Sequence, residues 1–273
     1  TVEWIAVNDG GGLSEEIRKI AEAYIMSVFH KEPSALPERF RHLFGYLCRS
    51  AELFAGRLKA EFEASAFRPC DFELTVGQGG ESVLPMKLAG DGISVELRGK
   101  IDRVDAYEDG EGRLYLRVVD YKTGEKTFDI RNVRLGLDMQ MLLYLFALES
   151  YQRRAGTPMQ PAGVLYVPGR CDMVKLKPGE DPAQADAERQ KDLRRKGLLL
   201  NDEAVLHAME AYEKKPQYLP FAPGPDGLIG DLASPAQLAE LERFVNGQVE
   251  AMIDEILSGA TAPNPIDRGP SDS

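Results

Sequence analysis

The sequence predicts an α/β protein in which a mixed β-sheet is flanked by helices. Apolar residues recur at helical spacing through the first quarter of the chain. Alternating or β-branched segments follow, separated by glycine-rich turns, which is typical of strands. A helix and a buried strand come next, and this order favours helices packed on a mixed sheet. We find no internal repeat and no clear linker, so we expect a single domain spanning residues 1–273.

Two helices are expected in the N-terminal part, residues 1–68. The first begins at Ser14, after a glycine-rich turn, and runs to about His30. The second extends from Pro37 to about Ala66 as one long helix or as two, because apolar residues recur there with a period near 3.6.

The sheet is expected in the middle part, residues 69–168. We predict four strands in an antiparallel meander at Asp71–Val76, Val83–Leu88, Ile93–Asp105 and Arg113–Lys122. A helix rich in Leu, Met and Tyr should span Asn132–Gly156, and a buried strand, Ala162–Val167, should follow between two prolines.

The C-terminal part, residues 169–260, is expected to be mainly helical, and residues 261–273 form a Pro/Gly/Ser/Asp-rich tail. We predict a charged helix at Pro182–Lys196, a helix at Glu203–Tyr212, a loop at Pro216–Gly230 and a helix at Ser234–Ser258. Ser234 is the expected N-cap of the last helix, with Pro235 at its first position.

Composition excludes several classes of protein. Hydrophobic residues make up 43% and charged residues 28%, which argues against a disordered or disulfide-stapled chain. We find neither a signal peptide nor an apolar run of the roughly 18 residues that a membrane span needs. Three separated cysteines favour a reducing cytoplasm. The net charge of −11 argues against DNA binding by the whole surface, although not against a local basic groove.

The candidate catalytic residues lie near the ends of two neighbouring segments of the predicted sheet. Asp102, in the motif Gly99-x-x-Asp102, ends an alternation of apolar and polar residues, and Asp120-x-Lys122 ends the next strand across a short hairpin. Side chains two residues apart point to the same face of a strand, so Asp120 and Lys122 share a face. If Asp102 lies beside them, two carboxylates and an ammonium group converge.

Such a cluster suits hydrolysis of a phosphodiester. Carboxylate oxygens bind Mg²⁺ or Mn²⁺, and the metal lowers the pKa of an attacking water while a lysine orients that water or stabilises the anion. Gln140 and Tyr144 stand four residues apart on one face of the following helix and can reach the same cleft. A bare D-x-K is expected about once by chance in a chain of this length. Only the ordered combination of these motifs is specific.

This combination resembles the PD-(D/E)xK nuclease superfamily and its RecB-like branch, and more closely the C-terminal nuclease domain of the AddB subunit of bacterial AddAB helicase-nucleases. The segments Phe67–Leu74 and Gly197–Leu206 are also similar to AddB, so the resemblance covers most of the chain. It implies a restriction-endonuclease-like fold and a Mg²⁺- or Mn²⁺-dependent deoxyribonuclease, an exonuclease that depends on ATP only in the complete complex. It further implies DNA and an AddA-type helicase-nuclease subunit as partners in the repair of double-strand breaks.

The resemblance also assigns roles to individual residues. It implies that Asp102 and Asp120 are metal ligands and that Lys122 is the catalytic lysine. Gln140 and Tyr144 would form an accessory motif near the DNA strand, and Glu73 is a further candidate metal ligand.

The chain departs from the family pattern in two ways. The RecB-like branch has a histidine in a G-x-x-x-H helix before the core, and neither His30 nor His42 stands in that context. AddB proteins also hold an iron–sulfur cluster through four cysteines, three of them after the nuclease core. This chain has three cysteines and ends near the point where those ligands would begin, so we expect no cluster in it.

Simpler interpretations stay open for each of these groups. A solvated set of salt bridges could account for Asp102, Asp120 and Lys122. Ordinary hydrogen bonds on a helix surface could account for Gln140 and Tyr144. Glu73 could be a plain exposed strand residue. We interpret Arg103 and Asp105 as an edge-strand ion pair, the run Glu188–Lys196 as a solvated helix face or a DNA path, and Cys48, Cys70 and Cys171 as buried small hydrophobes.

Two rival functions also stay open. The first is a non-catalytic DNA-binding or scaffold domain of the same fold, which the missing histidine favours and which the retention of Asp102, Asp120 and Lys122 argues against. The second is a stand-alone RecB-like exonuclease. Co-purification of the native protein with a helicase would separate this second rival from an AddB subunit.

Overall fold

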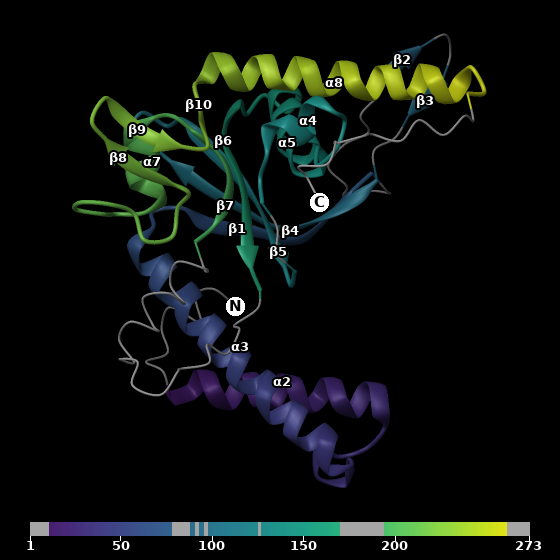
Figure 1. Ribbon diagram of the computed structural model, residues 1–273, viewed down its shortest axis with the longest axis vertical. Coiled ribbons are helices and arrows are strands. Elements are labelled where there is room, and N and C mark those ends of the chain that lie inside the picture. The colour runs from purple at the N-terminus through teal and green to yellow at the C-terminus, as the bar shows by residue number, and fades with distance from the viewer. Residues whose placement is uncertain are drawn as a thin grey trace, which may run out of the picture.

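The computed structural model describes residues 11–77, 88–90, 93–95, 98–124, 127–169 and 194–260. Within these residues the main sheet has six strands in the order β1-β4-β5-β6-β7-β10 (Figure 1). Their bounds are Arg68–Val76, Gly99–Glu108, Leu114–Lys122, Met159–Pro168, Lys196–Leu200 and Leu232–Ala233.

The sheet is mixed, as the sequence predicts. β1, β4 and β5 pair antiparallel, and β6 pairs parallel to β5. β7 is antiparallel to β6, and β10 is parallel to β7. Two helices, α4 (Ile130–Arg134) and α5 (Gln140–Arg154), connect β5 to β6, as a parallel pair requires. The predicted α/β class and the buried strand at Ala162–Val167 are therefore confirmed.

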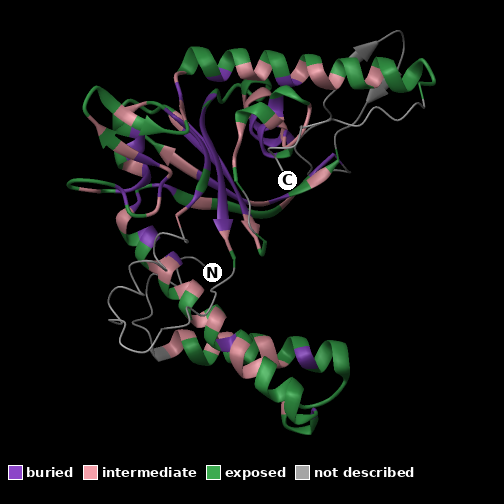
Figure 2. Cartoon of the chain, viewed as in Figure 1, coloured by how far each residue is buried: buried purple, intermediate pink, exposed green. Residues whose placement is uncertain are grey.

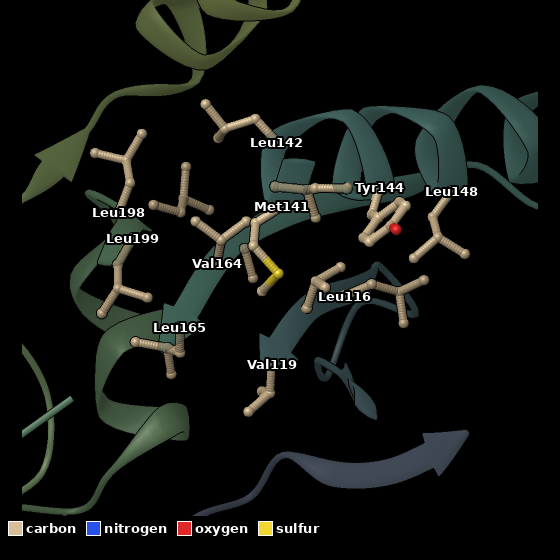
Figure 3. Close-up of a cluster of buried hydrophobic side chains, with 14 of the residues drawn as sticks. Leu116, Val119, Met141, Leu142, Tyr144, Leu148, Val164, Leu165, Leu198 and Leu199 are labelled. Carbon is tan, nitrogen blue, oxygen red and sulfur yellow. The ribbon is translucent and has the colours of Figure 1, made fainter. Parts of the chain in front are cut away.

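One face of the sheet is covered by α5, and α8 (Pro235–Leu257) lies on the outer side of α5 (Figure 1). Burial is concentrated in the central strands and in α5 (Figure 2). Apolar side chains of the helix meet those of the strands in one continuous core (Figure 3). Its members include Met141, Leu142 and Leu148 of α5 and Leu116 and Val164 of the sheet.

The N-terminal part is a helical hairpin that extends away from the sheet (Figure 1). It consists of α2 (Gly11–Phe29), a short 3₁₀ turn, η1 (Pro33–Ala35), and α3 (Glu38–Ala64). Both predicted helices are confirmed, and the second is one continuous helix. Phe54 and Phe62 in the second half of α3 contact Tyr121 and Arg103, whose side chains lie on the face of the sheet opposite α5.

The predicted four-stranded meander is wrong in its pairing. β2 (Leu88–Gly90) and β3 (Ile93–Val95) form a small antiparallel sheet of their own, while β1 pairs directly with β4. The predicted strand Ile93–Asp105 is therefore two strands, and most of the predicted strand Val83–Leu88 lies outside the described residues. A local hairpin pattern does not reveal which strands pair over longer distances.

The predicted helix Asn132–Gly156 is also divided in two, α4 and α5. Gly136 and Asp138 both have positive φ, at 77° and 55°, which ends one helix before the next begins. The helical periodicity was correct on both sides of this break.

The C-terminal part contains more strands than the sequence predicts. The loop at Pro216–Gly230 includes a hairpin, β8 (Phe221–Gly224) and β9 (Gly227–Gly230), and β7 begins where the charged helix should end. Residues 182–193 of that helix and the tail 261–273 lie outside the described residues. The other two predicted helices are confirmed as α7 (Glu203–Met209) and α8, and Ser234 caps α8 in a capping box.

Arg194 and Arg195 do not belong to a solvated helix face. Arg194 donates hydrogen bonds to the carbonyl groups of Leu219 and Phe221, and Arg195 is buried in an ion pair with Glu61 of α3. Both arginines therefore hold elements together, and the interpretation of this end of the charged run as a solvated surface was wrong. None of the helices in the described part of the chain is long and apolar enough to cross a membrane.

Candidate active site

The two aspartates singled out from the sequence lie at the open end of the β4–β5 hairpin, away from its turn. The antiparallel ladder pairs Arg103 with Val119 and Val104 with Val118. Continuing this register by one residue sets Asp102 opposite Asp120, and cross-strand neighbours point to the same face. Alternation puts Lys122 on that face too, so this register favours the predicted convergence of the three side chains.

One hydrogen bond and one ion pair support this arrangement. The Asp102 carboxylate accepts a hydrogen bond from the backbone N–H of Tyr121 at 2.8 Å. The ammonium group of Lys122 lies 2.6 Å from Oδ2 of Asp120. The Asp120 side chain is 12% exposed and that of Lys122 is 36% exposed, so the lysine stands at the solvent side of the carboxylate.

The accessory pair of α5 lies beside the start of β4. The amide nitrogen of Gln140 donates to the hydroxyl of Tyr144 at 3.0 Å, as expected for residues four apart on one helix face. Tyr144 is buried and Gln140 is exposed. The Tyr144 hydroxyl lies against Gly99, so both ends of the Gly99-x-x-Asp102 motif border this region.

Glu73 lies at the edge of the same region on β1. The pairs Phe72↔Arg103 and Leu74↔Ile101 set it opposite Asp102. Its backbone has a positive φ of 54°, which is uncommon for a residue other than glycine. Its carboxylate forms an exposed ion pair with Lys100, so in this structure it is engaged with a lysine on the strand rather than with the two aspartates.

Two residues that the sequence did not single out lie near Asp120. Tyr166 of β6 is the register partner of Asp120, and burial raises the pKa of its hydroxyl, with Asp138 and Asp120 adding to the effect. Asp138 accepts a hydrogen bond from the side chain of Asn132 at 2.8 Å. The sequence marks them only by their positions. Tyr166 lies near the end of the strand that pairs with β5, and Asp138 lies two residues before Gln140.

Comparison with known proteins decides the family. The model of the PD-(D/E)XK nuclease superfamily matches residues 6–268, which is nearly the whole chain. The chain belongs to the PD-(D/E)XK nuclease superfamily. The resemblance drawn from the strand-end motifs is therefore confirmed, and the six-stranded mixed sheet with flanking helices is consistent with the restriction-endonuclease-like fold.

Curated relatives are larger proteins, each named as the B-type subunit of an ATP-dependent helicase/deoxyribonuclease. The relative from Desulforudis audaxviator is 32% identical over 98% of this chain. That from Ruminiclostridium cellulolyticum is 30% identical over 92%, and that from Clostridioides difficile is 27% identical over 81%. The aligned regions cover 23%, 22% and 20% of these relatives, so the chain spans less than a quarter of their length.

The donor set of this PD-(D/E)XK chain fits a small, hard cation. Within the described residues there is no group of three or more His, Cys, Asp or Glu side chains arranged to hold a metal. Mg²⁺ needs no such group, because it keeps several waters and binds through one or two carboxylates together with substrate phosphates. Asp102 and Asp120 are the two carboxylates that would fit this requirement.

The sequence interpretation of Arg103 and Asp105 as an edge-strand pair was partly wrong. The ion pair forms, with Nε of Arg103 2.8 Å from Oδ1 of Asp105. Both side chains are fully buried, however, because β4 lies between β1 and β5 and is covered by α3. They lie on the opposite face of the sheet from Asp102 and Asp120.

The cysteines of the described residues have different environments. Cys48 is buried in α3, as predicted, whereas Cys70 on β1 is exposed, which corrects the expectation that it is a buried hydrophobe. Cys171 lies outside the described residues. The expectation that this chain carries no iron–sulfur cluster stays a prediction.

A hollow of about 660 Å³ lies elsewhere, between α3 and the segment before β8. Arg49, Gly56 and Arg57 line it from the helix, and Tyr218 lines it from the other side. It shares no residue with the strand-end cluster and is bordered by α3, so it is separate from the candidate active site.

Proposed function

We propose that this chain is a Mg²⁺- or Mn²⁺-dependent deoxyribonuclease domain. The observation that carries the proposal is the placement of Asp102 and Asp120 on one face of adjacent strands, with Lys122 2.6 Å from Asp120. Membership of a nuclease superfamily gives this placement its chemical meaning. A solvated salt bridge alone accounts for Asp120 and Lys122 but not for the second carboxylate beside them.

Each residue has a distinct role in the proposed hydrolysis. Asp102 and Asp120 would hold the cation, which would supply charge neutralisation at the phosphate and activation of water. Lys122, at the solvent side of Asp120, orients the attacking water or stabilises the developing anion. Exposed Gln140, held by Tyr144, contacts the DNA strand beside β4. Glu73 can approach Asp102 only by leaving Lys100, so we assign it a secondary place.

We propose further that this domain is the nuclease module of an AddB-type subunit of a helicase/deoxyribonuclease. Relatives named as that kind of subunit align with nearly all of the chain and are more than four times as long. In that setting the module acts in the cytoplasm on single strands or unwound duplex ends, as an exonuclease, together with an AddA-type subunit. ATP serves the helicase parts, since the sequence contains no G-x-x-x-x-G-K-[ST] loop.

The nuclease proposal is tested by cleavage of single-stranded DNA with Mg²⁺ or Mn²⁺, with and without EDTA. Asp120→Asn should abolish cleavage and weaken metal binding in calorimetry while the fold survives. Asp226→Asn is the matched control, because Asp226 is exposed in the β8–β9 turn, and it should behave as wild type. EDTA-resistant cleavage by Asp120→Asn would contradict the proposal, and a wild-type protein that binds no divalent metal would favour a scaffold domain.

The assembly proposal needs a different experiment. Affinity purification of the full-length natural protein should recover a helicase subunit in equal amount. A full-length protein that purifies alone and still degrades DNA ends would instead indicate a stand-alone exonuclease.

A further inference from the structure

Tyr121 contributes to both faces of the sheet. It stands between Asp120 and Lys122 on β5, and its backbone N–H donates to the Asp102 carboxylate at 2.8 Å. Its side chain points to the opposite face, toward α3. One residue thus touches the candidate active site through its main chain and the buried side of the sheet through its ring.

On the buried side the ring is held at two points. Nη1 of Arg103 donates to the Tyr121 hydroxyl at 2.6 Å, and the ring packs edge-to-face on Phe54 of α3 with centroids 5.7 Å apart. The guanidinium of Arg103 also lies 5.5 Å from the ring centroid.

Arg103 is itself fixed in place. Its Nε lies 2.8 Å from Oδ1 of Asp105 and its Nη2 donates to Oδ2 at 3.1 Å. Oδ2 of Asp105 also lies 2.8 Å from Nε of Arg117. All three side chains are fully buried, where an ion pair is only weakly screened by salt. The hydroxyl of Tyr121 therefore accepts its hydrogen bond from a buried guanidinium group that is also paired with Asp105.

The position of these contacts along the strands gives them their significance. The β4–β5 ladder runs from Glu108↔Leu114 to Arg103↔Val119. Past its last pair, Tyr121 reaches two consecutive residues of β4, Asp102 through its N–H and Arg103 through its hydroxyl. These two bonds connect the strands at the point where the candidate metal ligands project.

We propose that Tyr121 is a positioning residue, whose bond to Arg103 fixes its own backbone N–H and thereby holds Asp102 beside Asp120 and Lys122. This inference rests on the proposed nuclease function. It gives the buried Arg103–Asp105 pair a role in positioning the candidate active site, which lies on the other face of the sheet. A purely structural hydroxyl would add stability without affecting Asp102.

The test compares Tyr121→Phe with Tyr115→Phe in the whole chain. Tyr121→Phe keeps the ring on Phe54 and removes only the hydroxyl. Tyr115 is also buried, on the same strand and the same face, and it packs on Tyr107 away from the site. Tyr115→Phe likewise removes one hydroxyl from a buried tyrosine, and we expect it to leave Asp102 unaffected because its contacts lie away from the site.

Three measurements then separate positioning from plain stability. In Tyr121→Phe the amide of residue 121 should exchange with solvent about tenfold faster, because a hydrogen bond to a charged group is worth about that factor or more. The affinity for Mn²⁺ in calorimetry and the rate of single-strand cleavage should each fall by about tenfold, for the same reason. Tyr115→Phe should leave all three values at those of wild type.

The outcomes distinguish this inference from the proposed function. Equal amide exchange in the two variants would overturn the positioning role, even if wild type cuts DNA and Asp120→Asn does not. Faster exchange in Tyr121→Phe would support it, and Mn²⁺ binding shows whether the effect reaches the metal ligands. A wild-type protein without metal binding or cleavage would overturn the nuclease function, whereas the exchange measurement would still decide whether Tyr121 fixes Asp102.

Discussion

The hydroxyl of Tyr144 occupies the space that a side chain at Gly99 would need. A Cβ at position 99 would overlap the Tyr144 oxygen and lie 2.9 Å from Cζ of the ring. Tyr144 is buried in the core that α5 forms with the sheet, so its ring has little room to move (Figure 3). Gly99 therefore sets how closely the helix that carries Gln140 approaches the strand that carries Asp102.

Gly99→Ala should consequently damage both stability and activity. We expect a loss of about 1 to 3 kcal/mol in the free energy of unfolding, the usual cost of overpacking a core, and slower DNA cleavage because Gln140 and Tyr144 are displaced. Gly247→Ala is the control, since a Cβ there meets nothing within 4 Å and alanine favours a helix. Chemical denaturation checks both, and equal stability of the two variants would contradict the contact.

The buried charges on the other face of the sheet predict a large effect of a single substitution. Asp105 pairs with both Arg103 and Arg117, and all three side chains are fully buried. Asp105→Ala leaves two buried guanidinium groups without this partner, so we expect a loss of about 3 to 5 kcal/mol or failure to fold.

The matched control for Asp105 is an exposed ion pair. Glu15→Ala breaks the pair of Glu15 with Lys19 on α2, where both side chains are mostly exposed, and should leave the denaturation midpoint unchanged. Similar midpoints for Asp105→Ala and wild type would show that the buried pair contributes nothing to stability.

The environment of Glu149 predicts that the stability of the protein depends on pH. Burial, with repulsion from Glu242 on α8, raises the pKa of this carboxyl above its ordinary 4.5, although Arg153 partly offsets the shift. The folded protein therefore binds the proton more tightly than the unfolded chain, and wild-type stability falls as the pH rises from about 4.5 through the raised pKa.

Glu149→Gln removes this titration. The free energy of unfolding of the variant minus that of wild type should therefore increase with pH across this window and become constant above it. Denaturation of the variant and of wild type at a series of pH values measures this difference. A difference for Glu149→Gln that is flat or falls with pH would contradict the assigned shift.

The local features of the fold and site could be predicted from the sequence. The two N-terminal helices, the cap of α8 at Ser234 and the common face of Asp120 and Lys122 follow from spacing and capping chemistry, which depend on neighbours in the chain. The placement of Asp102 beside Asp120 could be predicted because a short hairpin joins their two strands, so this pairing also depends on residues that are near in the chain.

The features that depend on distant parts of the chain could not be predicted. Nothing near β1 in the sequence shows that it pairs with β4 rather than with the next strand. Arg195 looked like one charge of a solvated run because its partner, Glu61, lies far away on α3. The contact of Tyr121 with Arg103 was missed for the same reason, since a tyrosine between two polar residues gives no sign of what lies behind the strand.

The most direct test of the account is the cleavage of single-stranded DNA by wild type and Lys122→Ala, with metal binding measured on the same preparations. If Asp102 and Asp120 hold the cation and Lys122 serves the chemical step, Lys122→Ala should bind Mn²⁺ at least as well as wild type and cut DNA slower by about 100-fold or more. Lys19→Ala, which breaks only the exposed pair with Glu15 on α2, should cut as wild type does. Metal-dependent cleavage by Lys122→Ala at the wild-type rate would contradict the assignment of this site.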